Sequence, residues 1–464
     1  MDPQSVNINR RDFLRGAAAL GASLYAAPSI FGQAAPDASG DLNFAMIGSG
    51  KQGQVLLDCC IRIKGIRLKA ICDIWPYNQK MALSKVRMVF PDVKIYTDYK
   101  EMLATEKDLQ ACIVASPDFM HAEHACACLN AGLNVYCEKE MSNDLAKARE
   151  MVATARKSGK LLQIGHQRRS NPRYQLAQKI AREQGLMGRI THINGQWNRS
   201  PHLDMASNER IALDKTTLEK YGYESMQQFL NWRWYKKFAG GPIVDLGSHQ
   251  IDIFSWFLGV NPKSVFATGG VDYYRDRGHE WYDNVMTIYQ YETPKGAARA
   301  FYQVLNNTGH GAYYEIFLGD EASLTLSEAA SQGYFLREED FAAAQAKDAL
   351  WEDMVKKATL KRLDNTAAAQ AAAAADAKAA GGTAAVSTRK AVDSRAPWII
   401  TDLLGDKPYH QPHLENFFAA IRDKNVPLNC PAEVGYETAV AVLKVNESIA
   451  KGTPLDFKPE EFKV

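Results

Sequence analysis

The glycine-rich turn at residues 48–53, Gly-Ser-Gly-Lys-Gln-Gly, constrains the fold of this chain more than any other feature. It follows an apolar run from Leu42 to Ile47, which predicts a buried strand, and it precedes residues 54–57, which predict the first turns of a helix. A second predicted strand ends at Asp73. A strand, a glycine-rich loop and a helix in this order are typical of the phosphate-binding end of a dinucleotide-binding domain.

A separate structural role is predicted for each glycine of this turn. Gly48 permits the tight turn, Gly50 lets a pyrophosphate approach the backbone, and Gly53 lets the helix pack closely on the strand. Asp73 follows about twenty residues later, where a carboxylate can accept both ribose hydroxyls and repel a 2'-phosphate. The sequence therefore predicts binding of NAD in preference to NADP.

The N-terminus has the layout of a twin-arginine export signal. Arg10 and Arg11 are followed closely by Phe13 and Leu14, and then by a mildly apolar stretch rich in Ala and Gly over 16–27. That stretch is too short and too weakly apolar to span a bilayer as a stable helix. A chance Arg-Arg pair before a tail is the alternative. We predict that residues 1–40 are signal and linker for the twin-arginine machinery, and that the folded protein is periplasmic.

Composition is that of an ordinary soluble protein after export. The 464 residues allow two domains, the 46% apolar content can fill both cores, and the net charge of +2 gives no reason to expect a nucleic-acid partner. No other segment has the pattern of a membrane-spanning helix.

Cysteine placement predicts buried thiols. Seven of the eight cysteines fall between Cys59 and Cys137, several of them within apolar strand or helix patterns. A protein that folds in the reducing cytoplasm would bury these as thiols. His124, Cys126 and Cys128 do not share one helical face, so we predict no metal site there.

From residue 41 to about 165, apolar runs of strand length alternate with amphipathic helical patterns. The alternation predicts an α/β Rossmann domain over 41–165, with a parallel sheet and helices on both faces. The predicted strands end near Ile47, Cys72, Tyr96, Ala115, Cys137 and Ile164. Ligands of such sheets bind outside the carboxyl ends of the strands. The residues at those ends are 48–53, Asp73, Ser116, Pro117, Glu138 and Lys139.

Residues 166–464 have the pattern of a second, α+β domain for substrate binding and oligomerisation. It has longer alternating runs, which predict a large, mostly antiparallel open sheet. These runs are Ile190 to Trp197, Val265 to Val271, Val285 to Tyr291, Ala298 to Leu305 and Tyr313 to Phe317. One helix is predicted over 244–258, closed by Gly259, and another over 433–450 that packs back on the first domain. An alanine-rich stretch at about 339–395 predicts a solvent-exposed, helical or partly disordered insertion.

Candidate catalytic residues lie on both domains. Asp245, His249 and Asp252 are spaced i, i+4, i+7 on the predicted helix, so two carboxylates and an imidazole would share one face. A histidine flanked by carboxylates can take a proton near neutral pH. In the alternative, Asp245 caps the helix and His249 is a core residue. Lys139 follows a predicted strand at the ligand edge of the sheet, where its charge can stabilise a substrate alkoxide.

Together these motifs resemble the glucose-fructose oxidoreductase, inositol dehydrogenase and rhizopine catabolism family, called Gfo/Idh/MocA. The motifs are residues 48–53, Ala115-Ser116-Pro117-Asp118 with His121, Cys137-Glu138-Lys139, and Gly240-Gly241-Pro242 leading to Asp245 and His249. The resemblance covers about residues 41–335 and resumes at about 408. It implies a Rossmann domain, an open-sheet second domain, a nicotinamide cofactor, a sugar or cyclitol substrate, and a homo-oligomer.

The resemblance also assigns roles to residues. Lys139, Asp245 and His249 match the catalytic positions. The cofactor positions are Gly48, Ser49, Gly50, Gln52, Gly53, Asp73, Ser116, Pro117, His121, Glu138 and Lys139. The family commonly has proline after the lysine, whereas this chain has Glu140. We also predict that Arg168 and Trp197 contact the sugar, because aromatic faces pack on sugar C–H groups and arginine can hydrogen-bond hydroxyls.

These features predict an exported, NAD-dependent oxidoreductase that acts on a hydroxyl of a sugar or glycoside. His249 would take the hydroxyl proton, Lys139 would stabilise the oxyanion and Asp245 would orient the pair. Because no pool of free NAD replenishes the cofactor outside the inner membrane, we expect it to be held tightly. Two alternatives stay open, a redox-neutral NAD-dependent glycoside hydrolase and a non-catalytic sugar-binding protein.

Overall fold

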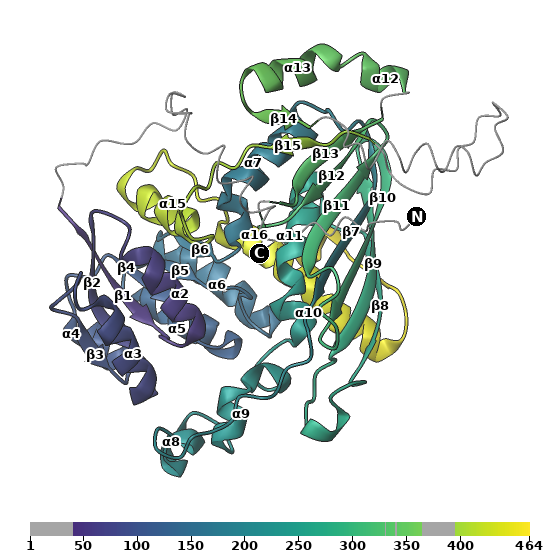
Figure 1. Ribbon diagram of the computed structural model, residues 1–464. Coiled ribbons are helices and arrows are strands. Elements are labelled where there is room, and N and C mark those ends of the chain that lie inside the picture. Colours follow the sequence, from purple (N-terminus) through teal and green to yellow (C-terminus); the bar gives the residue numbers. More distant parts are fainter. Residues whose placement is uncertain (1–39, 330, 339–340, 364–394) are drawn as a thin grey trace, which may run out of the picture. The chain divides into compact units, whose positions relative to one another are not determined.

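Two β-sheets organise the chain in the computed structural model, which describes residues 40–329, 331–338, 341–363 and 395–464 (Figure 1). The predicted export signal and the alanine-richest stretch, 367–380, lie outside the described residues. Within the described ranges, no helix is long and apolar enough to cross a membrane.

The strands of the first sheet are β1 (Leu42–Ile47), β2 (Ile66–Cys72), β3 (Lys94–Tyr96), β4 (Ala111–Val114), β5 (Asn134–Cys137) and β6 (Leu162–Ile164). All are parallel, in the order β3-β2-β1-β4-β5-β6. This is the Rossmann order, and it confirms the six predicted strands and the fold of the first domain. The order reverses between β1 and β4, so the carboxyl ends of these two strands flank the crevice in which a dinucleotide binds.

The helices are α2 (Lys51–Cys60), α3 (Pro76–Val86), α4 (Tyr99–Thr105), α5 (Asp118–Asn130), α6 (Leu145–Ser158), α7 (Pro172–Gln178), α8 (Lys215–Lys220), α9 (Met226–Leu230), α10 (Pro242–Asp245), α11 (Gly247–Leu258), α12 (Ala342–Gln345), α13 (Asp348–Lys356), α15 (Gln411–Arg422) and α16 (Ala432–Lys451). Successive strand residues point to opposite faces of the first sheet. Phe44 and Met46 therefore pack with α2, α3 and α15, whereas Ala45 and Ile47 pack in the core that includes α4, α5, α6 and α16.

The second sheet has ten strands, β7 (Ile190–Asn198), β8 (Ser264–Gly270), β9 (Asn284–Thr293), β10 (Gly296–Leu305), β11 (Tyr313–Gly319), β12 (Ala322–Leu326), β13 (Gly333–Arg337), β14 (Leu360–Arg362), β15 (Trp398–Ile400) and β16 (Leu455–Asp456). Their order is β14-β15-β13-β12-β11-β7-β10-β9-β8-β16. Only β7 and β10 pair in parallel among these described strands, so the predicted mostly antiparallel sheet is confirmed. Helices α11 and α16 cover one face of the sheet (Figure 1).

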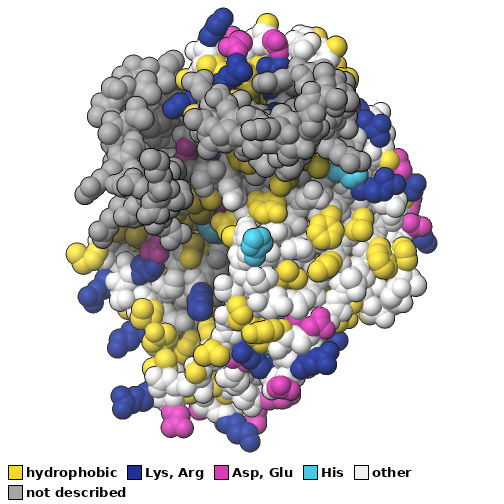
Figure 2. All heavy atoms as spheres, turned by 45° about the vertical axis from the view of Figure 1, so that its right-hand side comes forward, with side chains coloured by type: hydrophobic (Ala, Val, Ile, Leu, Met, Phe, Trp, Pro, Cys, Tyr) yellow, Lys and Arg dark blue, Asp and Glu magenta, His cyan; other side chains and the backbone are white. Residues whose placement is uncertain are grey.

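The opposite face of this sheet carries exposed apolar side chains. Burial along β9 alternates strictly, with Tyr289 and Tyr291 inward and Met286 and Ile288 outward. Phe266 of β8 lies directly opposite Ile288 and is also exposed. Figure 2 shows hydrophobic side chains spread over this side of the molecule. An exposed apolar sheet face is typical of a surface that meets another protein.

The predicted helix over 244–258 is two helices in the structure, so this prediction is wrong in detail. Leu246 separates α10 from α11. The backbone N–H of His249 donates to the Leu246 carbonyl three residues earlier, and this bond tightens the chain at the junction. Gly259 ends α11 in the left-handed conformation, as predicted.

Helix α16 connects the two sheets. On one side, Tyr436 accepts a hydrogen bond of 2.7 Å from Arg149 of α6, in the Rossmann domain. On the other side, Ser448 accepts a hydrogen bond of 3.1 Å from the backbone N–H of Ala267 in β8. The prediction that the last long helix packs back on the first domain is confirmed.

All eight cysteines lie in described parts of the chain, and all are buried free thiols, as predicted. Burial, which disfavours the charged thiolate, raises the pKa of Cys59 and of Cys72 to about 12. These thiols are therefore poor nucleophiles at neutral pH.

The described part of the alanine-rich segment, residues 341–363, is mostly exposed, as predicted, but one stripe of α13 packs against the second sheet, which was not predicted. Trp351 of α13 is 1% exposed. Its ring contacts Trp398 of β15 and Phe335 of β13, with ring centres 5.2 and 5.5 Å away. Met354, one helical turn later, is also buried. The helical part of the prediction is confirmed, but average composition concealed this apolar stripe.

Replacing Trp351 with Ala should destabilise the protein by about 3–5 kcal/mol, because the change leaves a cavity in a closed core. The neighbouring Leu350 is 50% exposed, and Leu350→Ala should change stability by about 0.5 kcal/mol or less. Urea unfolding of both variants measures the difference. Equal, small effects would contradict the packing of α13 described above.

Candidate active site

A cavity of about 1260 Å³ is lined by the carboxyl ends of the Rossmann strands and by residues of the second domain. Most of the predicted site residues line it. They are Gly48, Gly50, Gln52, Asp73, Ser116, Pro117, His121, Glu138, Lys139, Trp197, Asp245 and His249. Ser49, Gly53 and Arg168 are not among its lining residues.

The glycine-rich turn has the shape that a pyrophosphate needs. Gly48 has φ +89°, and a Cβ there would lie 2.6 Å from the Ala115 backbone. A Cβ at Gly53 would lie 2.3 Å from the Gly48 carbonyl oxygen, so any side chain would force α2 away from the loop. At Gly50 the nearest atom is the Asn78 amide nitrogen at 3.6 Å, which leaves the backbone open to the cavity. Gly50 also precedes the N-terminus of α2, where backbone N–H groups favour an anion.

Asp73 is held in place by its neighbours. Its carboxylate accepts hydrogen bonds from the Ser49 backbone N–H at 2.7 Å, from the Ser49 hydroxyl at 3.1 Å and from the Trp75 backbone N–H at 2.8 Å. Burial raises the pKa of Asp73, and these hydrogen bonds oppose that rise. Ser49 thus contacts Asp73 and lies behind the cavity wall. The residues of this turn and Asp73 fit the phosphate and ribose of NAD.

Hydrogen bonds connect the loops that follow β1, β4 and β5. Gln52 donates to the Glu138 carboxylate at 3.0 Å. The His121 ring lies between the carbonyl oxygens of Ser116, at 2.6 Å, and Glu140, at 2.7 Å. Burial lowers the pKa of His121 to about 4, although both carbonyls oppose the change. These contacts fix the loops that line the nucleotide end of the cavity.

Lys139 and Asp245 form an ion pair between the two domains. The Lys139 ammonium lies 3.1 Å from one Asp245 carboxylate oxygen and also donates to the Asp245 backbone carbonyl. The other carboxylate oxygen lies 3.3 Å from Nε of Arg233. Burial alone would raise the pKa of Asp245, but Lys139 and Arg233 outweigh it and hold this pKa well below its usual range. Asp245 is therefore an ionised anchor for Lys139.

His249 lines the cavity as a neutral imidazole. Burial and the nearby charges of Lys139 and Arg168 hold the pKa of His249 well below its usual range, so at neutral pH the ring is uncharged, with a free nitrogen lone pair, and is a weaker base than a free imidazole. Its Nδ1 atom is buried and makes no hydrogen bond within the described structure. Asp252, predicted on the same helical face, instead pairs with Arg169 at 2.7 Å. The predicted flanking of His249 by Asp252 is therefore wrong, because Arg169 takes that carboxylate.

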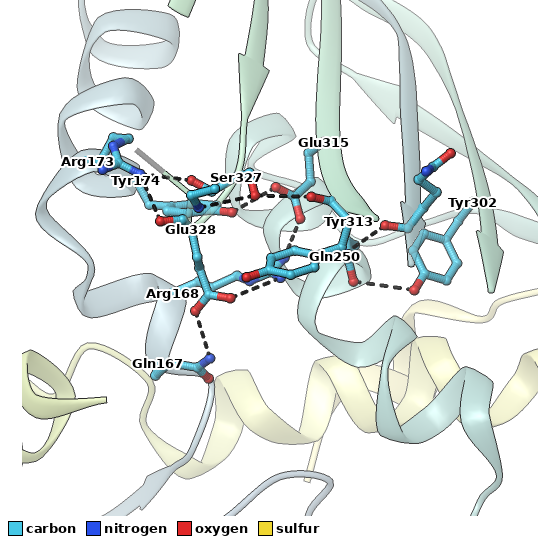
Figure 3. Close-up of polar contacts among 12 residues, drawn as sticks. Gln167, Arg168, Arg173, Tyr174, Gln250, Tyr302, Tyr313, Glu315, Ser327 and Glu328 are labelled. Carbon is cyan, nitrogen blue, oxygen red and sulfur yellow. Dashed lines mark hydrogen bonds and ion pairs between the residues drawn. The ribbon is translucent and has the colours of Figure 1, made fainter. Parts of the chain in front are cut away.

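Trp197 presents a supported aromatic surface near His249. The two rings are 5.5 Å apart, and Tyr313 stacks on Trp197 at 4.5 Å. The Arg168 guanidinium, predicted to contact the sugar, is 1% exposed and lies 5.6 Å from the Trp197 ring centre. It pairs with Glu315 and Glu328, as Figure 3 shows. The structure thus places Arg168 beneath the aromatic surface, and its contact with a sugar stays a prediction.

Two charged residues at the catalytic end of the cavity, Arg199 and Arg233, were not predicted from the sequence, and Asp118 was named there as a motif residue without a role. Arg233 lies between Trp232 and Trp234. Nothing in the sequence around it indicated that its side chain would reach Asp245. Burial and the charge of Asp245 raise the pKa of Asp118 to about 7.

The segment between β7 and α10, residues 199–241, is here called the arm. It carries α8 and α9 and packs against the Rossmann domain. The Trp75 indole donates to the Ile211 carbonyl at 2.6 Å, and its ring meets Phe229 edge to face at 5.6 Å. Phe119 meets Phe238 at 5.1 Å. The arm thereby encloses the cavity beside the predicted ribose contact.

Metal ligands do not converge in the described residues, where no three His, Cys, Asp or Glu side chains are placed to hold an ion. His124 instead hydrogen-bonds the Ser116 hydroxyl through Nδ1 at 2.9 Å.

Two sequence models of one family match the chain. The first, "Oxidoreductase family, NAD-binding Rossmann fold", matches residues 42–166, and the second, "Oxidoreductase family, C-terminal alpha/beta domain", matches residues 215–397. The chain belongs to the Gfo/Idh/MocA oxidoreductase family. Its cofactor is the NAD of this family's Rossmann domain.

Individual relatives of the family show the range of named activities. The chain is 24% identical over 229 residues to 2,7-anhydro-N-acetylneuraminate hydratase of Mediterraneibacter gnavus, which covers 49% of this chain and 52% of the relative. It is 29% identical over 233 residues to D-glucoside 3-dehydrogenase of Escherichia coli, covering 49% and 58%. The matches thus span about half the length of these curated relatives. Levoglucosan dehydrogenase in complex with NADH and levoglucosan shares the fold, with a TM-score of 0.64, 18% identity and coverage of 90% of this chain and 99% of that one.

Glu140 stands where the Gfo/Idh/MocA family commonly has proline. The Lys139–Glu140 peptide bond is cis, and Lys139 nevertheless reaches Asp245. The Glu140 side chain is fully buried, and its Oε2 atom makes no hydrogen bond within the described structure. Burial raises the pKa of Glu140 from its usual 4.5 to about 8.

Glu140→Gln should become more stable relative to the natural protein as pH rises from about 5 to about 8. In that window the folded protein keeps a proton on Glu140 that the unfolded chain has released, so the natural protein loses stability with rising pH, by at most about 1.4 kcal/mol per pH unit. Glutamine does not titrate and lacks this loss. Chemical unfolding of both proteins at pH 5, 6.5 and 8 measures it, and a difference that does not change with pH would refute the buried, protonated carboxyl.

Proposed function

We propose that this chain is an NAD-dependent oxidoreductase that acts on a hydroxyl group of a sugar or glycoside. The observation that supports it most is the meeting of an ionised Lys139–Asp245 pair and a neutral His249 at one end of the cavity. The glycine-rich turn and Asp73 line the same cavity. When bound there, NAD supplies an acceptor for the hydride that leaves the substrate carbon.

The protein's own residues carry out proton transfer, stabilisation of the oxyanion and positioning of the sugar. His249 is uncharged at neutral pH and takes the proton of the hydroxyl group. Lys139 donates a hydrogen bond to the oxygen as negative charge develops on it. Asp245, held between Lys139 and Arg233, keeps the ammonium in position. Trp197 offers its ring to the C–H face of the sugar.

A redox-neutral reaction on the same residues is the second candidate. One matched relative is named a hydratase, and hydration brings no net oxidation. In such a reaction the substrate is transiently oxidised and then reduced again, so a glycoside would release its aglycone without net consumption of NAD. A non-catalytic sugar-binding protein is a weaker candidate, since it does not explain why Lys139, Asp245 and His249 converge at one end of the cavity.

Two further parts of the proposal concern export and the cofactor. The arginine pair at residues 10–11, with its apolar sequel, supports export of the folded protein by the twin-arginine machinery to the periplasm. Packing of the arm on Trp75 and Phe119 beside the nucleotide end supports a tightly held cofactor. The exposed apolar residues of β8 and β9 support a homo-oligomer.

Lys139→Ala should lower turnover by roughly a hundredfold to a thousandfold, because the developing oxyanion loses its cation, while bound NAD remains. The test follows absorbance at the reduced-nicotinamide band during addition of a panel of sugars and glycosides, and it measures the nucleotide released on denaturation. Lys263→Ala, an exposed lysine with a side chain 60% accessible, is the control. Undiminished turnover of Lys139→Ala would refute its role. Release of aglycone without reduced nicotinamide would favour the redox-neutral candidate.

Replacing Arg10 and Arg11 together with lysine should keep the protein in the cytoplasm, because the twin-arginine machinery reads this pair. Cell fractionation followed by immunoblotting measures it, with Asn7→Ala as a control outside the pair. Equal periplasmic amounts of the lysine variant and the natural protein, or a cytoplasmic natural protein, would refute the export proposal.

A further inference from the structure

Arg199 is a cation of the cavity wall that forms no ion pair within the described structure, although its charge acts on Asp245 together with those of Lys139 and Arg233. It directly follows β7, and its guanidinium lies 5.6 Å from the centre of the Trp197 ring, which is 5.5 Å from the ring of His249. Arg199 lines the cavity and is partly exposed to it. Within the described structure, its guanidinium forms no ion pair and no hydrogen bond, and the Trp197 ring is the contact that it makes.

The neighbouring carboxylates already have ion-pair or hydrogen-bond partners. Both oxygens of Asp245 are taken, one by Lys139 at 3.1 Å and the other by Arg233 at 3.3 Å. Glu328 accepts hydrogen bonds from Gln167 and Arg168. Lys139, Arg233 and Arg199 all act on Asp245 through their charges, and Arg199 is the one of them that forms no ion pair with a carboxylate within the described structure.

Burial also reduces the ionisation of Asp118, the remaining carboxyl group at this end of the cavity. Burial and the charge of Asp245 raise the pKa of Asp118 to about 7, so near neutral pH it is only partly ionised. At the catalytic end of the cavity the three cations Lys139, Arg199 and Arg233 thus outnumber the ionised Asp245 and the partly ionised Asp118. Glu138, which also lines the cavity, is hydrogen-bonded to Gln52. A partly buried guanidinium is stabilised by an oxyanion that accepts its N–H groups.

We propose that the substrate is an anionic sugar, whose oxyanion binds Arg199 while one of its hydroxyl groups faces Lys139 and His249. This inference rests on the proposed function, whose substrate class it narrows. A carboxylate, a sulfate ester or a phosphate ester offers the same arrangement of acceptor oxygens to a planar guanidinium. Trp197 lies between Arg199 and His249 in the chain of contacts, so the sugar ring that bridges them has an aromatic surface to pack on.

The cofactor's own phosphates are a poor match for Arg199. The open backbone of Gly50 and the N-terminus of α2 form a place for them on the Rossmann domain. Arg199 belongs to the second domain, beside Trp197 and His249. Its replacement should therefore leave NAD binding unchanged.

The test uses the full chain loaded with NAD and matched sugars. The probes are D-glucose and D-galactose, their uronates, glucose 6-sulfate and glucose 6-phosphate. Calorimetry measures binding, and absorbance at the reduced-nicotinamide band or product release measures kcat/KM. At least one oxyanionic sugar should exceed its neutral counterpart by about tenfold or more, and comparison among the uronate, sulfate and phosphate identifies which oxyanion the site prefers.

Arg199→Gln should remove this preference by raising KM for the anionic sugar about tenfold, with little change for the neutral one. Arg199→Lys should keep part of it, because the charge remains but the fork of N–H donors is lost. Lys263→Gln, which removes the charge of an exposed lysine that does not line the cavity, is the control and should keep the full preference.

Three outcomes would overturn the inference. They are equal or better binding of the neutral sugars, an equal loss for neutral and anionic sugars in Arg199→Gln, and a loss of NAD from that variant. Turnover of neutral sugars without any preference for anions would refute the inference and leave the proposed function standing. Arg199-dependent binding of anionic sugars without turnover or aglycone release would support the inference and refute the proposed function.

Discussion

The ion pair between Lys139 and Asp245 is the contact on which the site depends. One partner follows β5 of the Rossmann sheet and the other ends α10 of the second domain, so the pair forms only when both domains are folded and correctly placed. Both side chains are largely buried, at 10% and 16% exposure. Removing either partner would leave a charge with little solvent to replace its contact, which is costly in a protein interior.

Sequence alone predicted the elements that are set by local pattern. The Rossmann strands are short apolar runs that end at turn residues, and the glycine positions follow from contacts that any side chain would block, as at Gly53. Lys139 and His249 were predicted because motifs place them at a strand end and on a helix. Arg199 and Arg233 were missed because only folding brings Arg199 beside His249 and Arg233 to Asp245, and no sequence spacing connects these residues. Trp351 was missed because average composition conceals a single apolar stripe.

The aromatic surface of the cavity shows how buried polar groups can support an aromatic ring that faces a cavity. Trp197 lies on Tyr313, and the guanidinium of Arg168 lies below both rings. Glu315 and Glu328 neutralise that guanidinium, and Tyr174 donates to Glu315 at 2.8 Å (Figure 3). A network in which most polar atoms are paired rigidifies its surroundings. The ring that faces the cavity is thereby fixed before any ligand arrives.

The Rossmann core is completed by residues from the far end of the chain. Leu414, Phe417 and Phe418 of α15 belong to the same buried cluster as Phe44 of β1, and Phe418 meets Phe44 edge to face at 5.4 Å. A ribosome releases β1 to β6, α2 and α3 long before α15, so during translation this face of the sheet lacks the α15 part of its cover until almost the whole chain has emerged. A nascent chain that ends before α15 would therefore keep the patch around Phe44 that Phe417 and Phe418 cover in the complete fold open to chaperones.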